Sequence, residues 1–248
     1  MVRQIMFIEF ADFQVSVVKN FSLASNRTVR YDALMNEHVK EITDGNALGD
    51  APSVREQEVL AAVLDLMVEE GDGFSMAAVA ARASCSKETL YRWYGDRDGL
   101  LTATVKWQAS KVIMPELGEE QVTLAAFSRI LQDFAESWLT VLTGDVSIAL
   151  NRLAVSHAAN SKTNLGNIVL ENGPLAMRQR LLPIFEIGNR QAFINKTEDE
   201  AFRLFFGLVV ADAQIRVLLG EQKKPSKREI SEFAQRAVEQ FLRLCGKN

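Results

Sequence analysis

Cysteine and histidine are scarce in this sequence of 248 residues, which contains only two of each. Cys85 and Cys245 lie far apart, and neither forms a CxxC pair or a Cys/His cluster with His38 or His157. Structural zinc sites and disulfide frameworks depend on such groupings. We therefore expect no disulfide bond, no bound metal and no cofactor.

Long apolar runs are also missing. The nearest one, FFGLVVA at residues 205–211, is far shorter than the roughly 18 residues that a membrane-spanning helix needs. Glu9 and Asp12 interrupt the apolar stretch at the N-terminus before it reaches the length of a secretory signal. The sequence thus predicts a protein of the reducing cytoplasm that has no membrane partner.

The sequence signatures of common catalytic sites are absent as well. The chain has no GxSxG, GxGxxG, P-loop or HExxH pattern, and two histidines leave few options for general base catalysis. We therefore expect a protein that is not an enzyme.

Charge is distributed unevenly along the chain. The net charge of -4 argues against a protein that coats nucleic acid indiscriminately. Residues 75–111 nevertheless hold six basic residues against three acidic ones, a local balance of +3 (six minus three). A modest basic patch on an acidic body is typical of a protein that binds selected sites on nucleic acid.

The most informative segment is residues 75–101, SMAAVAARASCSKETLYRWYGDRDGLL. It predicts two short helices separated by a tight turn, with the hydroxyls of Ser75 and Ser86 capping the first turn of each helix. In the second helix Leu90 and Tyr94 are four residues apart and should point inward, which leaves its polar side chains for another surface. This division of faces is what a helix that reads a DNA groove requires.

These residues resemble the tetracycline-repressor (TetR) family of bacterial transcription regulators, whose second helix commonly reads S-x-x-T-L-Y-x-H-F and is followed by K-x-x-L. The resemblance is strong across residues 54–110, and the C-terminal layout weakly resembles the AefR-like branch of the family. The matching residues are Ser86, Thr89, Leu90, Tyr91, Tyr94, Arg97, Leu100 and Leu101.

The resemblance implies a DNA-binding role for several side chains. Lys87, Thr89 and Arg92 would face base edges or nearby phosphates, Tyr91 and Trp93 would hold the sugar-phosphate backbone, and Arg97 would meet a phosphate at the start of the next helix. Glu88 would repel phosphate. The residues that we assign to DNA binding are Ser75, Lys87, Thr89, Tyr91, Arg92, Trp93 and Arg97.

Three residues depart from the family pattern. Trp93 replaces a histidine that often contacts phosphate, so the contact comes from its indole N–H or is lost. Ser84 replaces the turn glycine, so the turn either avoids positive φ or carries some strain at Ser84. Cys85 replaces a valine and can fill the same apolar slot.

We expect an all-α protein in three parts. Residues 1–52 form an N-terminal extension whose apolar spacing fits a helix as well as a strand. Three interpretations stay open: a disordered segment, an upstream start artefact with the true start at Met35, or an arm that packs on the body or follows DNA. Residues 53–100 form a three-helix DNA-binding domain of helix-turn-helix type. Residues 101–248 form a larger helical domain for ligand binding and dimerisation.

Within this larger domain, helices are expected at about 98–114, 120–142, 145–160, 198–219 and 227–244. A loop, or a helix broken near Gly173 and Pro174, should follow residue 160, and Pro183 should kink or interrupt the segment that ends near residue 193. The last two helices carry apolar stripes that pack within one chain or form a four-helix bundle with a second copy, and the family resemblance favours the homodimer. Its interface residues would be Phe202, Phe205, Phe206, Val209, Ile230, Phe233, Ala237 and Phe241.

The resemblance also implies that the helices between about residues 98 and 194 enclose a small-molecule pocket. For Phe134 and Trp138, which belong to a core stripe, packing is the stronger interpretation, and His157 fits a core or surface histidine equally well. The candidate ligand-binding residues are Trp107, Phe134, Trp138, Asn151, His157, Met177, Arg178 and Phe185.

The sequence therefore predicts a DNA-binding transcriptional regulator, and it favours a homodimeric repressor that an unidentified small molecule releases from double-stranded operator DNA. The alternative is a helical ligand-binding or scaffolding protein whose helix-turn-helix contacts another protein. Binding to DNA that falls steeply with added salt would separate the two.

Overall fold

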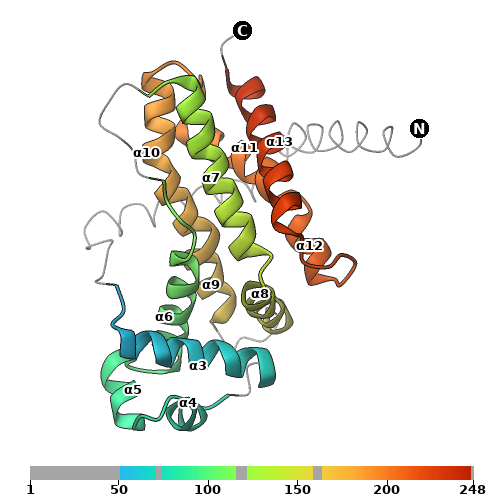
Figure 1. Ribbon diagram of the computed structural model, residues 1–248. Helices are drawn as coiled ribbons and strands as arrows, with labels where there is room; N and C mark the ends of the chain where they lie inside the picture. The colour runs from blue at the N-terminus through green and yellow to red at the C-terminus, as the bar shows by residue number, and fades with distance from the viewer. Residues whose placement is uncertain (1–50, 71–73, 116–121, 159–163, 247–248) are drawn as a thin grey trace. The chain divides into compact units, whose positions relative to one another are not determined.

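The computed structural model describes residues 51–70, 74–115, 122–158 and 164–246, and all regular structure within these ranges is helical (Figure 1). The all-α class predicted from the sequence is therefore confirmed. Residues 1–50, on which the alternative interpretations of the N-terminal extension depend, lie outside the described residues.

Four helices make up the N-terminal part of this region, and Figure 1 shows the first three of them together at one end. The first begins where the Ser53 hydroxyl accepts a hydrogen bond from the backbone N–H of Glu56 at 3.3 Å, while the Glu56 carboxylate accepts one from the N–H of Ser53 at 2.8 Å. This reciprocal pairing satisfies two backbone donors and fixes the start of the helix. The four helices are α3 (Val54–Glu70), α4 (Met76–Arg82), α5 (Lys87–Tyr94) and α6 (Arg97–Ser110).

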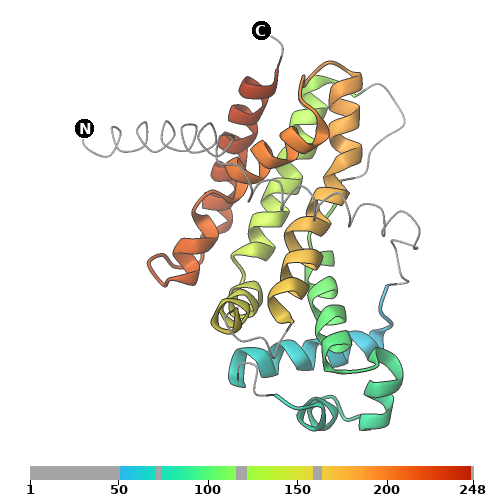
Figure 2. The same cartoon turned by 180° about the vertical axis from the view of Figure 1, so that it is seen from behind.

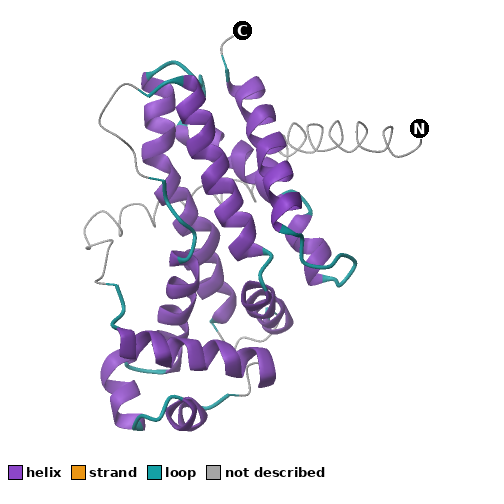
Figure 3. Ribbon diagram, in the orientation of Figure 1, coloured by secondary structure: helices purple, strands orange, loops and turns teal. Residues whose placement is uncertain are grey.

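The remaining elements are also helices (Figure 3). Most begin or end close to the positions that the apolar spacing predicts. They are α7 (Leu124–Leu142), α8 (Asp145–His157), α9 (Leu165–Leu170), a π-helical turn η2 (Glu171–Leu175), α10 (Ala176–Arg190), α11 (Glu198–Val210), α12 (Ala213–Leu218) and α13 (Lys227–Cys245).

The two prolines expected to interrupt the middle of the chain do not do so. Pro174 lies inside the π-helical turn, and α9, η2 and α10 follow one another without a loop from residue 165 to residue 190. A π turn shifts the hydrogen-bond partners by one residue, which can accommodate a residue without an N–H. Pro183 lies inside α10 and is exposed, and the helix continues through it although one carbonyl loses its backbone donor there.

The single helix expected at 198–219 is instead two helices. The break falls at Ala211, which has a φ of +39°, a conformation that is uncommon for residues other than glycine. Asp212 then accepts a hydrogen bond from Arg216 at 2.6 Å across the first turn of α12. The apolar spacing continues through the break, so periodicity alone could not reveal it.

The buried apolar side chains form two clusters. The first joins α3, α4, α5 and α6 to Leu150 and Leu153 of α8 and to Leu165 and Ile168 of α9. The second is built from α7, α10, α11 and α13, and Phe205 lies at its centre in contact with Phe134, Phe185 and Phe241. Because α8 and α9 contribute to the same cluster as α3 to α6, the two clusters do not divide the chain at residue 100. The domain boundary predicted there stays a prediction.

Helix α13 packs along both α7 and α11 (Figure 2). Six of the eight side chains assigned to a dimer interface are buried by this packing within one chain, and the other two, Phe206 and Phe233, are partly buried against the same cluster. These side chains therefore have little area left for a second subunit. An interface on this pair of helices would have to use their outward-facing residues. The six buried residues are Phe202, Phe205, Val209, Ile230, Ala237 and Phe241.

Candidate nucleic-acid interface

Serine side chains define the starts of α4 and α5, as the sequence predicts. The hydroxyl of Ser75 accepts a hydrogen bond from the backbone N–H of Ala78 at 3.1 Å, and the hydroxyl of Ser86 accepts one from Thr89 at 3.1 Å. Each bond satisfies an N–H that would otherwise lack a partner in the first helical turn. Ser75 thus caps α4, while its side chain stays exposed.

In the turn between the two helices, Ser84 adopts a φ of +50°. Of the two alternatives for this residue, the turn therefore has the one with positive φ and some strain. The N–H of Ser84 donates to the carbonyl of Ala81 at 3.2 Å, and the N–H of Cys85 donates to the carbonyl of Ala80 at 2.9 Å. This pair of bonds is the Schellman arrangement that ends many helices, in which glycine usually occupies the left-handed position. The turn therefore keeps its geometry, with a non-glycine residue at the strained position.

Helix α5 has one buried side and one exposed side. Leu90 is fully buried, whereas Tyr91 is 51% exposed and Lys87 and Arg92 are also exposed. Thr89 is partly buried, and its hydroxyl lies 3.1 Å from that of Ser86. The structure therefore brings Lys87, Tyr91 and Arg92 to one exposed helix, whereas Thr89 is partly engaged at its start.

The aromatic residues at the end of α5 pack against the first cluster. Trp93 is partly buried there and meets the ring of Tyr94 edge-on, with 6.2 Å between ring centroids. The Tyr94 hydroxyl is buried, without a hydrogen-bond partner among the described residues, and burial raises its pKa to about 12. Trp93 thus has a packing role at the end of α5.

Arg97 is the first residue of α6, which begins one residue earlier than the sequence suggests. Asp96 caps this helix by accepting a hydrogen bond from the N–H of Gly99 at 2.8 Å. The Arg97 guanidinium lies 4.8 Å from the centre of the Phe74 ring. This cation–π contact orients a partly buried cation at the start of a helix.

The acidic neighbour Glu88 is fully exposed near the start of α5. Hydrogen bonds from its own backbone N–H and from the Ser86 side chain lower the pKa of its carboxyl. Glu88 is therefore charged at neutral pH beside Lys87 and Arg92. The exposed surface of α5 carries mixed charge, with an excess of cations.

Hydrogen bonds with residues of α8 and α10 hold the far end of α6. Gln108 donates to the hydroxyl of Ser147 in α8 at 3.2 Å, and both residues are buried. Arg180 of α10 donates to the carbonyl of Ala109 at 3.1 Å and to that of Val112. The apolar spacing predicts the helix itself, but it gives no sign of the contacts from Gln108 and Arg180.

Four of the residues proposed to bind a ligand belong to the second hydrophobic cluster: Phe134, Trp138, Met177 and Phe185 are all buried there. For Phe134 and Trp138 this agrees with the packing interpretation.

The other ligand candidates are already engaged in contacts, or cannot be placed. Asn151 donates to the carbonyl of Ser147 at 2.8 Å, and Arg178 donates to the Asp199 carboxylate at 2.8 Å. The ring of Trp107 lies 4.1 Å beneath the ammonium of Lys111. The side chain of His157 lies outside the described residues.

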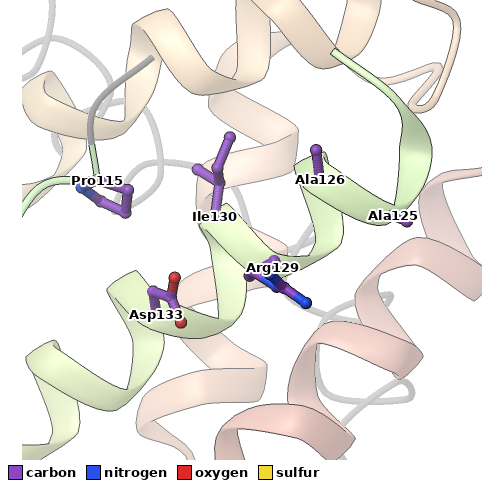
Figure 4. Close-up of a pocket in the computed structure, with 6 residues that line it drawn as sticks. All are labelled: Pro115, Ala125, Ala126, Arg129, Ile130 and Asp133. Atoms are coloured by element: carbon purple, nitrogen blue, oxygen red, sulfur yellow. The ribbon is translucent and has the colours of Figure 1, made fainter. Parts of the chain in front are cut away.

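A depression of about 600 Å³ lies beside the N-terminal half of α7 (Figure 4). Five of its lining residues come from α7, including Arg129, Ile130 and Asp133, and Pro115 closes one side. None of the proposed ligand-binding residues lines it, so the position of a ligand site stays a prediction. Within the described ranges, no group of three His, Cys, Asp or Glu side chains could hold a metal ion, and no helix is long and apolar enough to span a membrane.

Comparisons with known proteins match this fold. Residues 129–246 match the C-terminal domain of AefR-like transcriptional repressors. Among solved structures, a TetR transcriptional regulator from Agrobacterium tumefaciens is 39% identical, with 79% of this chain and 97% of that chain covered and a TM-score of 0.69. Curated proteins provide no match.

Two further solved structures share the fold at lower identity. A putative TetR-family regulator from Mesorhizobium loti is 23% identical, with 78% of this chain and 97% of that chain covered and a TM-score of 0.62. The flavonoid-responsive regulator FrrA is also 23% identical, with 78% and 98% covered and a TM-score of 0.60. At the 39% identity of the Agrobacterium protein, however, the likeness extends beyond the fold, and the chain therefore belongs to the TetR family of transcriptional regulators.

Proposed function

We propose that this transcriptional regulator binds double-stranded operator DNA through α5, as a homodimeric repressor that a small molecule releases. The observation that carries the proposal is the exposure of Tyr91, an aromatic side chain that is 51% exposed between the exposed cations Lys87 and Arg92. A tyrosine hydroxyl and two cations exposed on one short helix are suited to phosphates and base edges. Leu90 is fully buried and anchors the same helix to the first cluster.

A second copy of α5 supports selective binding. One recognition helix reads only a few base pairs, so useful selectivity requires two half-sites about one helical turn, or a multiple of it, apart. A homodimer supplies the second helix. Exposed apolar residues at and just after α12 are available for such an interface, among them Ile215 and Leu219, which are 50% and 77% exposed.

Release by a small molecule requires that the ligand bind one spacing of the two recognition helices better than the other. Helix α6 is suited to link the two events. Its start lies close to the end of α5, since a Cβ on Gly99 would lie 2.0 Å from the carbonyl oxygen of Tyr94. Its far end is bonded to α8 through Gln108 and to α10 through Arg180. A displacement of α8 or α10 would therefore act on the helix that supports α5.

The competing function is a scaffold whose α4 and α5 contact another protein. Affinity that decreases steeply with salt, along with sequence selection, separates DNA binding from this alternative. The test is to expose the full chain to a random-sequence duplex library and to measure its affinity for the selected duplex and for an unrelated duplex of equal length.

Four variants complete this experiment. Tyr91→Ala and Arg97→Ala should weaken binding to both duplexes, whereas Lys87→Ala should also relax the preference at one base pair. Arg190→Ala removes an exposed cation from α10 and serves as the control, with affinity close to that of the wild type. Failure to select a duplex, or unchanged affinity in all three interface variants, would contradict DNA binding through α5.

A further inference from the structure

Arg55, near the start of α3, reaches the turn between α4 and α5. Its Nη2 donates to the carbonyl oxygen of Ser84 at 2.8 Å and to that of Ala83, and its Nη1 pairs with the carboxylate of Glu58. One guanidinium thus joins a carboxylate on its own helix to two backbone carbonyls that lie 28 and 29 residues along the chain.

These two carbonyls lie at the point where α4 ends. The last carbonyls of a helix have no partner within the helix, and the partial negative charge of the helix dipole gathers there. The Schellman bonds of the turn use the carbonyls of Ala80 and Ala81 and leave those of Ala83 and Ser84 to other donors. Arg55 supplies these donors and places a positive charge at the negative end of α4.

The same turn contains the strained residue Ser84, with its φ of +50°. A left-handed conformation is unfavourable for a residue with a Cβ, and glycine avoids this cost. Bonds that form only in this conformation must therefore hold the turn in place. The bonds from Arg55 end on Ser84 itself and on the residue before it, so they act at the strained position.

We propose that Arg55 is a positioning residue for DNA recognition: by bonding the carbonyls of Ala83 and Ser84, it holds the turn that sets the direction of α5 relative to α3 and α4. The inference rests on the proposed function of α5. It assigns Arg55 no contact with DNA, since three of the five N–H groups of its guanidinium already bond acceptors of the protein and fix its orientation.

The geometry of the guanidinium distinguishes this role from a contact with phosphate. Lysine can replace arginine as a point charge near a phosphate, but its ammonium lacks the planar fork that spans two carbonyls and a carboxylate. A lost phosphate contact also reduces the slope of log affinity against log salt by about 0.9. A positioning residue leaves that slope unchanged, because the bound protein makes the same phosphate contacts after the turn has been ordered.

The experiment uses the full chain and the duplex that the wild type selects from the random library. Arg55→Ala and Arg55→Lys should both reduce affinity, on the order of tenfold for the alanine variant, with an unchanged salt slope. Glu58→Gln removes the carboxylate partner but keeps both carbonyl bonds, so its affinity should stay within about twofold of the wild type. Melting curves followed by circular dichroism identify variants that are unfolded at the assay temperature. If Arg55→Ala is among them, the affinity and salt slope of Arg55→Lys decide the test.

Ser84→Gly provides the rescue. Because glycine adopts a positive φ without strain, the double variant Arg55→Ala/Ser84→Gly should recover part of the affinity that Arg55→Ala loses. Wild-type affinity in Arg55→Lys, a salt slope reduced by about one, or no recovery in the double variant would overturn the positioning role. A wild-type chain that selects no duplex would instead overturn the proposed function, and the positioning role with it.

Discussion

Arg180 of α10 donates a hydrogen bond from its Nη1 to the carbonyl oxygen of Ala109, in the last turn of α6, at 3.1 Å. Its Nη2 also bonds the carbonyl of Val112, just beyond the end of that helix. Burial lowers the pKa of the Arg180 guanidinium, since desolvation disfavours its charged form. The two carbonyls offset this cost, and the contact ties the C-terminal end of α6 to a helix of the second cluster.

We expect Arg180→Met to lower the free energy of unfolding by about 2 kcal/mol, because the substitution leaves two carbonyls without a charged donor. Methionine keeps much of the aliphatic stem, so packing changes little. Urea unfolding followed by circular dichroism measures the loss. Arg190→Met is the matched control on the exposed side of α10, and an equal loss there would show that the carbonyl bonds of Arg180 are not the cause.

Tyr94 provides a test of the buried surface behind α5. Its hydroxyl has no hydrogen-bond partner among the described residues, so Tyr94→Phe should leave stability unchanged or raise it by up to about 1 kcal/mol at neutral pH. Chemical denaturation of the two proteins at pH 7 measures the difference. A clear loss of stability in the variant would mean that the hydroxyl is bonded in solution.

The same residue predicts a dependence on alkaline pH. The pKa of Tyr94 is raised from 10.0 to about 12 in the folded chain, so between these values the folded state binds more protons than the unfolded state. Stability linked to Tyr94 is therefore fully present below pH 10 and is lost as the pH rises toward 12. Tyr94→Phe should flatten the decline of stability between pH 10 and pH 11, whereas Tyr91→Phe, at an exposed position, should not.

Local signals in the sequence predict the helices of the candidate interface well. Ser75 and Ser86 cap their helices through bonds between residues three positions apart, and the apolar spacing places Leu90 inside. The presence of serine where the family has a turn glycine also marks the position at which strain is found. Such features depend only on neighbours along the chain, so the pattern of residue types is sufficient.

Sequence patterns do not reveal hydrogen bonds from a side chain to the backbone carbonyl of a residue far away in the chain. Arg55 and Arg180 bond carbonyl oxygens, which every residue carries, so no residue type at the other end marks the partner. The breaks in the helices are equally hidden: Pro174 and Pro183 do not end a helix, while Ala211 does. For the aromatic stripes, the apolar pattern cannot distinguish burial within one chain from burial against a second.

Gly99 tests how closely α5 and α6 must approach. A Cβ at this position would lie 2.0 Å from the carbonyl oxygen of Tyr94, so the backbone would have to move. We expect Gly99→Ala to lower the free energy of unfolding by about 3 kcal/mol and to weaken DNA binding, because the start of α6 is pushed away from the end of α5. Thermal unfolding and the affinity for the selected duplex measure the two effects.

Gly166→Ala is the control for this substitution. Its Cβ would meet no atom within 4 Å, and it lies in the first turn of α9. Alanine is the better helix former by up to about 1 kcal/mol, so this variant should be as stable as the wild type or more stable. A wild-type melting temperature for Gly99→Ala would show that α5 and α6 can separate at no cost.

Removing the charge of Glu88 should change the binding affinity in opposite directions for a DNA partner and for a basic protein partner. Its carboxylate is fully exposed on α5, and the hydrogen bonds that lower its pKa keep it ionised at neutral pH. Glu88→Gln should therefore raise the affinity for both the selected and the unrelated duplex by about threefold to fivefold at low salt, because it removes a charge that repels phosphate. The gain should shrink as salt is added.

Glu239→Gln is the control for this substitution, because it removes an exposed charge from α13 and should leave the affinity unchanged. If Glu88→Gln weakened binding to both duplexes, this residue could not face a polyanion, and α5 would have to meet DNA on another side.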